Sequence, residues 1–321
     1  MPRPPNLTER QKQQLSRLEP VLRTAAKRGD YGTAKRIAAE IQDVLRPTGH
    51  ETRLMQAKNW LFEAAMEAGK VASVAVPGFV GVRKKMSVGT RVYLEATALL
   101  AICHLRLNDL EKAEPYMAEA LKRGEKNITS DRRRAQFQRR MIDRFEAEWV
   151  LATLRVRQPF EALDPVQVEN EAGRMVATMT EDEMMERLGT TVPSEIVDTI
   201  YRVYEFAHSQ LSPADQKYLP SPKDRRKQKE VGKTVYDAAK EVVWRSLCDP
   251  ENDVYKLWNE AGVEAVVNKK VVGVAVVAAL GGLTIGWLGL ATALTAMIFK
   301  MGLQVFCKVS EPRMLMISKS E

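Results

Sequence analysis

Histidine is the commonest metal ligand and general base in proteins, and this chain has three histidines. His50, His104 and His208 lie on separate segments and form neither an HExxH motif nor another zinc spacing. Residues 232–234 read Gly-Lys-Thr, as in phosphate-binding loops, but position 227, where such a loop needs its first glycine, is a lysine. We therefore predict no metal ion, no cofactor and no enzymatic activity.

Cysteines and clustered carboxylates give no stronger signal for catalysis. Cys103, Cys248 and Cys307 are far apart and contain no CxxC pair, so we expect reduced thiols packed in the interior. The acidic run Glu181–Glu183 follows Thr180 in a Thr-x-x-Glu pattern, which is typical of a helix capping box. We predict a helix start here and not a set of metal ligands.

Clusters of basic residues could neutralise phosphates of lipid or nucleic acid. They lie at 83–85, at 132–134 with 139–140, and at 223–229. The residues that we single out as contacts to an anionic surface are Arg83, Lys84, Lys85, Arg132, Arg133, Arg134, Lys269 and Lys270. No aromatic residues are interleaved with these clusters, so a membrane surface is favoured over nucleic acid. A solvated helix face remains the simplest alternative.

The formal net charge of +8 is unevenly distributed. Residues 1–150 hold 28 Lys and Arg against 18 Asp and Glu, whereas residues 151–210 hold 5 against 11. A basic front and an acidic middle could bind each other or face different partners.

The elements that must position these residues are predicted to be helices. Leucine, alanine, methionine, glutamate, lysine and arginine are plentiful and alternating strand patterns are scarce, which predicts an all-α fold. We expect helices over 9–28, 31–45, 51–68, 91–107, 110–122 and 130–157. The segment 71–90 breaks the helical pattern, so we expect a loop or a short extended pair there.

Two of these helix pairs share a pattern at their turns. Gly29-Asp-Tyr-Gly-Thr-Ala34 matches Asn108-Asp-Leu-Glu-Lys-Ala113, and residues 1–127 thereby resemble the tetratricopeptide (TPR) repeat. The resemblance implies stacked helical hairpins that bind a protein partner. The two alanines are farther apart than two of the repeat's periods of about 34 residues would place them, so an insertion is expected in 71–90. Unrelated helical hairpins would give the same local signals.

The run Val271–Phe299 contains no charged residue and follows a much longer stretch of ordinary composition. As one helix it would extend about 43 Å at about 1.5 Å per residue. A bilayer core is about 30 Å thick, so the run is predicted to cross it once, with tilt. Lysines at 269, 270 and 300 bracket the run, as charges bracket membrane helices.

Small residues in the run predict close helix contacts. Ala278, Gly282 and Gly286 are spaced by four and would form a ridge for self-association along one helix. The residues that we assign to the membrane and to self-association are Gly273, Ala278, Gly281, Gly282, Gly286, Trp287 and Gly289. The alternative is a buried helix, or two short helices, inside a soluble assembly.

These patterns predict a non-enzymatic interaction protein with TPR-like hairpins, a second helical region and a C-terminal apolar helix. The expected segments are TPR-like hairpins, an acidic region, a basic linker with helices, a membrane-inserting segment and a tail, over 1–157, 158–219, 220–268, 269–308 and 309–321. We expect it to bind a protein partner, to self-associate and to lie on the cytoplasmic face of a membrane. Two alternatives stay open: a toxin-like effector that disrupts membranes, as in bacterial anti-phage defence, and a soluble cytoplasmic subunit whose apolar run is buried by a partner.

Overall fold

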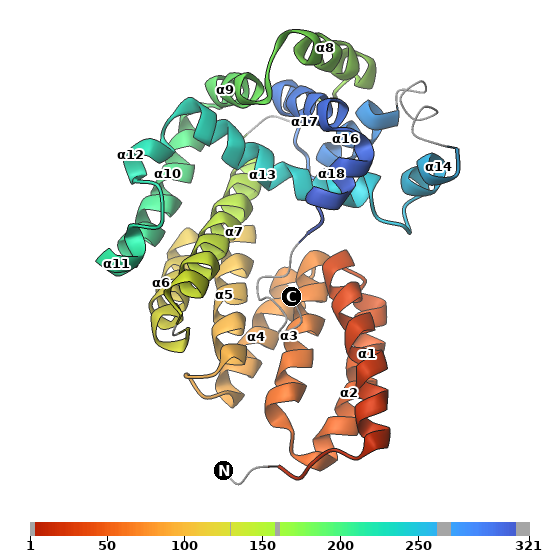
Figure 1. Cartoon of the computed structure of the whole chain (residues 1–321), viewed down its shortest axis with the longest axis vertical. Helices are drawn as coiled ribbons and strands as arrows, with labels where there is room; N and C mark the ends of the chain where they lie inside the picture. The colour runs from red at the N-terminus through yellow and green to blue at the C-terminus, as the bar shows by residue number, and fades with distance from the viewer. Residues whose placement is uncertain (1–3, 129, 158–160, 262–270, 313–321) are drawn as a thin grey trace. The chain divides into compact units, whose positions relative to one another are not determined.

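The computed structural model describes residues 4–128, 130–157, 161–261 and 271–312, and these contain helices but no strand (Figure 1). The prediction of an all-α fold is therefore confirmed for the described residues. The chain divides into two compact units, the first running to Met141 and the second covering Ile142–Pro312.

The first unit is a series of helical hairpins. Its helices are α1 (Glu9–Arg28), α2 (Tyr31–Leu45), α3 (Glu51–Glu67), α4 (Val76–Lys85), α5 (Arg91–Arg106) and α6 (Leu110–Asn127), with a 3₁₀ turn at Arg46–Thr48 and a π-helical turn at Val71–Ala75. Each helix packs against the next, and α3 also packs against α1 and α5. Successive hairpins therefore share one core.

The same turn closes the first helix of each hairpin. Gly29, Gly69 and Asn108 have φ angles of +70°, +76° and +56°, the left-handed conformation that ends many helices. In each case the next amide donates to the carbonyl five residues earlier, at 2.9, 2.8 and 2.9 Å. The turns recur at nearly equal intervals, from position 29 to 69 and from 69 to 108. The structure thus contains a third hairpin, in the middle, which the sequence pattern did not reveal.

The expectation of a loop and an insertion in 71–90 is therefore wrong. The segment forms the π-helical turn and α4, the second helix of the middle hairpin. Pro77 stands at the start of α4, where proline is tolerated, and Phe79 and Val82 are buried. Burial of this apolar face outweighs the weak helix preference of a valine- and glycine-rich sequence.

The second unit is built on α7 (Asp131–Arg157), whose residues from Ile142 onward belong to it, and on the helices that follow. These are α8 (Pro165–Thr178), α9 (Glu181–Thr191), α10 (Ser194–Ser209), α11 (Pro213–Gln216), α12 (Pro222–Arg225), α13 (Gln228–Leu247), α14 (Asp253–Ala261), α16 (Val271–Gly281), α17 (Leu288–Met301) and α18 (Leu303–Val309). Thr180 caps α9 in the predicted capping box with Glu183.

Two glycines allow α9 and α13 to cross at backbone contact. A Cβ atom added at Gly189 would lie 1.8 Å from the carbonyl oxygen of Gln228, and one added at Gly232 would lie 1.9 Å from that of Met185. No side chain fits in either gap, so this crossing requires glycine on both helices.

The apolar run is two helices and not one. α16 ends at Gly281, and Thr284 adopts a left-handed φ of +57°. The amide of Ile285 then donates to the carbonyl of Leu280 at 2.9 Å, which closes the turn. α16 and α17 pack against each other, as the blue ribbons of Figure 1 show. The prediction of a single spanning helix is wrong because the glycine-rich middle of the run turns the chain.

Both apolar helices pack into the core of the second unit, α17 more completely than α16. α17 packs against α8, α9 and α13, and its residues Leu290–Ile298 are buried without interruption. Among the described residues, no single helix has both the length and the hydropathy to cross a bilayer. α17 and α18 together have the required length and hydropathy, but the two helices meet at a bend of 106°.

The division into units differs from the five predicted segments. The described parts of the acidic region, the basic linker and the apolar segment all lie in the one unit Ile142–Pro312. The prolines at 220 and 222 lead directly into the short helix α12, whose Arg225 side chain is largely buried.

The expectation of separate thiols is wrong for two cysteines. Cys248 and Cys307 form a disulfide that joins the end of α13 to α18. The indole Nε1 of Trp244 donates to the carbonyl of Cys307 at 2.7 Å beside it. No local pattern reveals this pair, because 59 residues separate its members.

Candidate functional site

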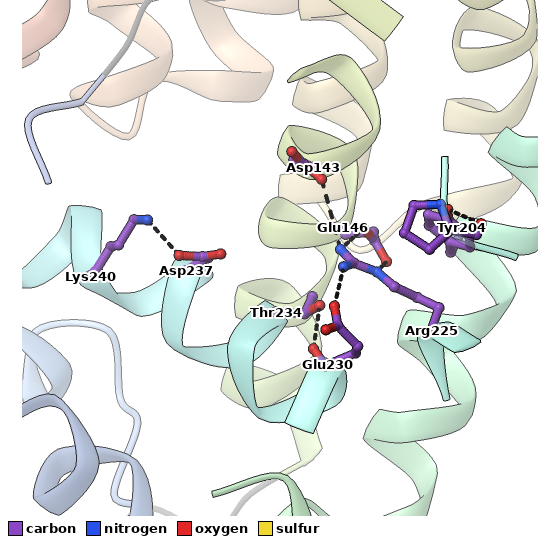
Figure 2. A network of polar contacts seen from close by, with 9 residues as sticks. Asp143, Glu146, Tyr204, Arg225, Glu230, Thr234, Asp237 and Lys240 are labelled. Atoms are coloured by element: carbon purple, nitrogen blue, oxygen red, sulfur yellow. Dashed lines mark hydrogen bonds and ion pairs between the residues drawn. The ribbon is translucent and has the colours of Figure 1, made fainter. Parts of the chain in front are cut away.

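Arg225 is the centre of a polar cluster in the second unit (Figure 2). Its guanidinium lies 2.7 Å from Glu146 Oε2 and 3.3 Å from Glu230 Oε2, and a second bond reaches Glu146 Oε1 at 3.4 Å. Asp143 lies at 3.7 Å. Three carboxylates thus face one guanidinium.

Helix caps and an aromatic ring hold Arg225 in place. Ser221 caps the short helix α12 by accepting from the amide of Asp224, which fixes the direction of the next residue. Tyr204 on α10 lies with its ring centre 5.3 Å from the guanidinium carbon, and its hydroxyl donates to the carbonyl of Pro220 at 2.7 Å. This cation–π contact orients the guanidinium toward α7.

The charges of this cluster do not balance. Burial raises the pKa of Glu146 to about 7, and the attraction of Arg225 offsets burial only in part. Burial alone would lower the pKa of Arg225, but the carboxylates of Glu146 and Asp143 outweigh it and raise that pKa, so the guanidinium stays charged. Because three carboxylates share one cation, the most buried of them carries a proton most readily.

A carboxyl group with a pKa near 7 has the acidity of a general acid or base. Glu146 is fully buried, however, and both of its oxygens bond to Arg225, so no substrate atom can reach it. The arrangement suits a clamp that ties α7 to α12 and α13. Arg144 adds a second tie, with ion pairs to Glu148 at 2.8 Å and to Glu241 on α13 at 2.5 Å.

A cavity of about 360 Å³ lies between α8, α9 and α17. Its lining combines two arginines, one glutamate and three threonines with four apolar or small residues: Glu171, Arg174, Met175, Thr178, Arg187, Leu188, Thr191, Gly289, Thr292 and Ala293. Cavities of this size hold small ligands.

The predicted basic contacts are scattered, and two of them, Arg83 and Arg134, are largely buried. Arg83 is largely buried, 2.6 Å from Glu119 and 2.8 Å from the hydroxyl of Tyr93. Lys84 and Lys85 are exposed, and Lys85 lies 3.6 Å from Glu51. Arg83 therefore stabilises the first unit and is poorly placed to contact a surface.

The second predicted cluster lies at the start of α7. Arg132 and Arg133 are exposed, whereas Arg134 is largely buried, 2.9 Å from Asp131. Lys269 and Lys270 lie outside the described residues. Of the predicted contacts to an anionic surface, the described residues that are exposed are therefore the pairs 84–85 and 132–133.

The predicted self-association ridge does not lie along one helix. Ala278 is on α16, whereas Gly282 and Gly286 are in the turn that follows. A Cβ atom added at Gly286 would lie 2.3 Å from the carbonyl oxygen of Glu161, and one added at Gly273 would lie 2.5 Å from Glu169 Cγ. Gly273 and Gly286 therefore make close contacts within the chain, and Ala278, Gly282 and Gly286 do not form one ridge along a helix.

The remaining small and aromatic residues of that set lie around the same turn. Ala278 and Gly282 are exposed, and Gly281 has open space around it. Trp287 is half-buried at the start of α17, and its indole lies 3.0 Å from where a Cβ of Gly289 would be. Gly289 also lines the cavity.

The histidines occupy ordinary packing positions. His104 stacks on Tyr116 with ring centres 5.6 Å apart, and burial lowers the pKa of His104. His50 lies 2.9 Å from the hydroxyl of Thr48. Within the part of the chain that the structure describes, no three His, Cys, Asp or Glu side chains are placed to hold a metal ion.

Sequence reasoning missed the ion pair of Glu146 with Arg225 and the cavity. The ion pair joins residues 79 positions apart, and Arg225 sits in a basic run that suggests a solvated surface. The two arginines of the cavity stand on different helices in an acidic region. Neither feature leaves a local pattern in the sequence.

Comparisons with known proteins add no relative. No family model matches this chain, and no curated protein or solved structure resembles it closely enough to be counted as a relative. The resemblance to the TPR repeat therefore rests on the residues around the turns alone.

Proposed function

We propose that this chain is a non-enzymatic helical interaction protein whose first unit binds a protein partner. The observation that supports this is the recurrence of one turn, at Gly29, Gly69 and Asn108, in three consecutive hairpins. Hairpins that stack in this way expose an extended surface of repeated helices, which repeat proteins use for binding. The intervals between these turns are longer than the TPR period of about 34 residues, so the proposal is a TPR-like arrangement with longer hairpins.

Covalent cross-linking of the full-length chain in its own cells, followed by mass spectrometry, tests this proposal. The exposed pair Lys84 and Lys85 lies on the first unit, so Lys84→Glu with Lys85→Glu should remove a stoichiometric partner of acidic surface. Lys217→Glu, an exposed charge reversal in the second unit, is the control. Finding no stoichiometric partner, or the same partners in all three proteins, would count against the proposal.

A second candidate is a conditional membrane-inserting effector, supported by the uncharged run Val271–Phe299. In the folded second unit these residues are mostly buried, so insertion requires the unit to open. A permanent tether would need the same residues outside the core at all times. The burial therefore favours the toxin-like alternative over the tether, and self-association would follow opening.

A matched pair of lysine substitutions separates membrane insertion from simple burial. Val274 on α16 is 50% exposed and Val156 on α7 is 65% exposed, so the fold tolerates lysine at both positions. Insertion of the run would carry a lysine at 274 into the bilayer core, at a cost of about 3 kcal/mol. We expect Val274→Lys to lower liposome flotation and dye release of the full-length chain, and Val156→Lys to leave them unchanged.

The opposite results are equally informative. Equal flotation of the two variants would contradict insertion through this run. Absence of flotation by the unsubstituted chain would leave the run as the core of the second unit and the interaction protein as the whole function.

The proposed location follows from the same two candidates. We propose the cytoplasm, or the cytoplasmic face of a membrane for the effector. The Cys248–Cys307 disulfide counts against a reducing compartment, where such bonds are rare. Alkylation of intact cells before lysis decides this: two unmodified cysteines that become reactive only after reduction would place the chain in an oxidising compartment.

A further inference from the structure

The cavity between α8, α9 and α17 presents positive charge from two helices. Arg174 on α8 and Arg187 on α9 both line it, and both side chains belong to exposed residues. Neither forms an ion pair with another described residue. Two arginines that line one cavity without an ion-pair partner make a site for an anion.

One carboxylate also lines the cavity. Glu171 lines the same cavity and accepts a hydrogen bond from the side-chain amide of Gln167 at 3.1 Å. It lies on the same helix as Arg174, one turn earlier. A ligand that fills the cavity must therefore carry an anionic group and, next to it, a hydrogen-bond donor for Glu171.

The threonines of the lining are engaged or covered. Thr178 donates to the carbonyl of Arg174 and Thr191 to that of Leu188. Thr292 on α17 is 4% exposed and its hydroxyl oxygen is covered by the protein. The two arginines and Glu171 are therefore the polar side chains of the lining that a ligand can reach.

We propose that this cavity binds a small phosphorylated metabolite. Its phosphate lies between Arg174 and Arg187, and a hydroxyl of its carbon skeleton donates to Glu171. The cavity volume of about 360 Å³ suits a sugar phosphate or a nucleoside monophosphate. The inference does not depend on the proposed function.

The position of the cavity gives binding a structural consequence. The ligand contacts α8, α9 and the apolar helix α17 together, so it stabilises their packing. If the effector function holds, the ligand also favours the closed second unit.

Isothermal titration calorimetry on the full-length chain tests the site. The probes are inorganic phosphate, a hexose phosphate and adenosine monophosphate. The unphosphorylated hexose and adenosine are the negative controls. Arg174→Gln and Arg187→Gln should each weaken the phosphorylated probes by about tenfold to a hundredfold, the usual loss of a charged hydrogen bond. Lys217→Gln removes one exposed positive charge elsewhere in the unit and should change affinity less than about twofold.

Two further variants test the assigned roles. Thr292→Val should leave the affinity of all three phosphorylated probes unchanged, because the hydroxyl is covered and valine keeps the shape of threonine. Glu171→Gln removes the negative charge beside the arginines. It should strengthen inorganic phosphate severalfold and reduce the preference for the two phosphate esters over inorganic phosphate.

One more probe distinguishes a soluble phosphorylated metabolite from the phosphate of a lipid headgroup. Vesicles containing phosphatidic acid present the same phosphomonoester on a lipid. Binding to these vesicles alone, lost in Arg174→Gln, would assign the site to a lipid headgroup. No binding of any phosphorylated probe below about 1 mM, or equal affinity in the unsubstituted, Arg174→Gln and Arg187→Gln proteins, overturns the proposal. Failure of the membrane tests alone would leave it standing.

Discussion

Glu146 makes the stability of the second unit depend on pH. The pKa of an exposed glutamate is near 4.5, and burial raises that of Glu146 to about 7 in the fold. Between these values the folded state binds one proton more than the unfolded state, so stability falls as pH rises from about 4.5 to about 7. The loss is about 3 kcal/mol, since each pKa unit corresponds to about 1.36 kcal/mol.

The substitution Glu146→Gln isolates this contribution. Glutamine keeps the shape of the protonated side chain and cannot ionise, so the variant should lose the pH dependence. We expect it to match the unsubstituted protein near pH 5 and to be more stable near pH 8, by up to about 3 kcal/mol. Arg225 keeps Asp143 and Glu230 as partners in the variant.

Urea unfolding followed by tryptophan fluorescence measures the effect, because four of the five tryptophans, Trp149, Trp244, Trp258 and Trp287, belong to the second unit. Glu241→Gln is the control. It removes the partner of Arg144 in a pair that is partly exposed, and should cost less than about 1 kcal/mol at either pH. If Glu146→Gln is the less stable protein near pH 8, the attraction of Arg225 outweighs burial and the reasoning is refuted.

Three further sets of substitutions test the packing of the second unit. Replacing both Cys248 and Cys307 by serine should lower the stability of the unit by up to about 4 kcal/mol, because the disulfide closes a loop of 59 residues and so reduces the entropy of the unfolded chain. A reductant should then have no further effect on urea unfolding of this variant. Gly232→Ala should lower stability by about 1–3 kcal/mol in the same assay, because the new Cβ atom would collide with the backbone of α9. Gly173→Ala is the control: its Cβ atom would have nothing within 4 Å, so it should raise stability by about 0.5–1 kcal/mol. Equal effects of the two substitutions would contradict the α9–α13 crossing. Thr284→Gly should stabilise by about 1 kcal/mol, because a β-branched residue is strained at a φ of +57°, and a thermal midpoint that falls would argue for a continuous helix through the turn.

The helices themselves were largely predictable from the sequence, because their signals are local. The turn at Gly29 and the capping box at Thr180 each depend on residues within two helical turns. The two end hairpins of the first unit were recognised from their matching turns. The middle hairpin was missed because its second helix has valines and glycines, which burial alone makes helical.

The candidate sites could not be predicted, because each joins residues that are far apart in the chain. Glu146 meets Arg225 only when α7 packs on α12, and Arg174, Arg187 and Thr292 share a cavity only because three helices converge. Local pattern gives charge and periodicity but not the neighbours of a buried group.

The apolar run shows where sequence ends and tertiary structure begins. Its composition by itself determined that Val271–Phe299 must leave water, because no charged side chain interrupts it. It did not determine where the run goes. The tertiary structure decided that: a turn at Thr284 folds the run into α16 and α17, and α8, α9 and α13 cover it within the same chain. A bilayer and a protein core remove apolar surface from water equally well, so only the neighbouring helices distinguish them.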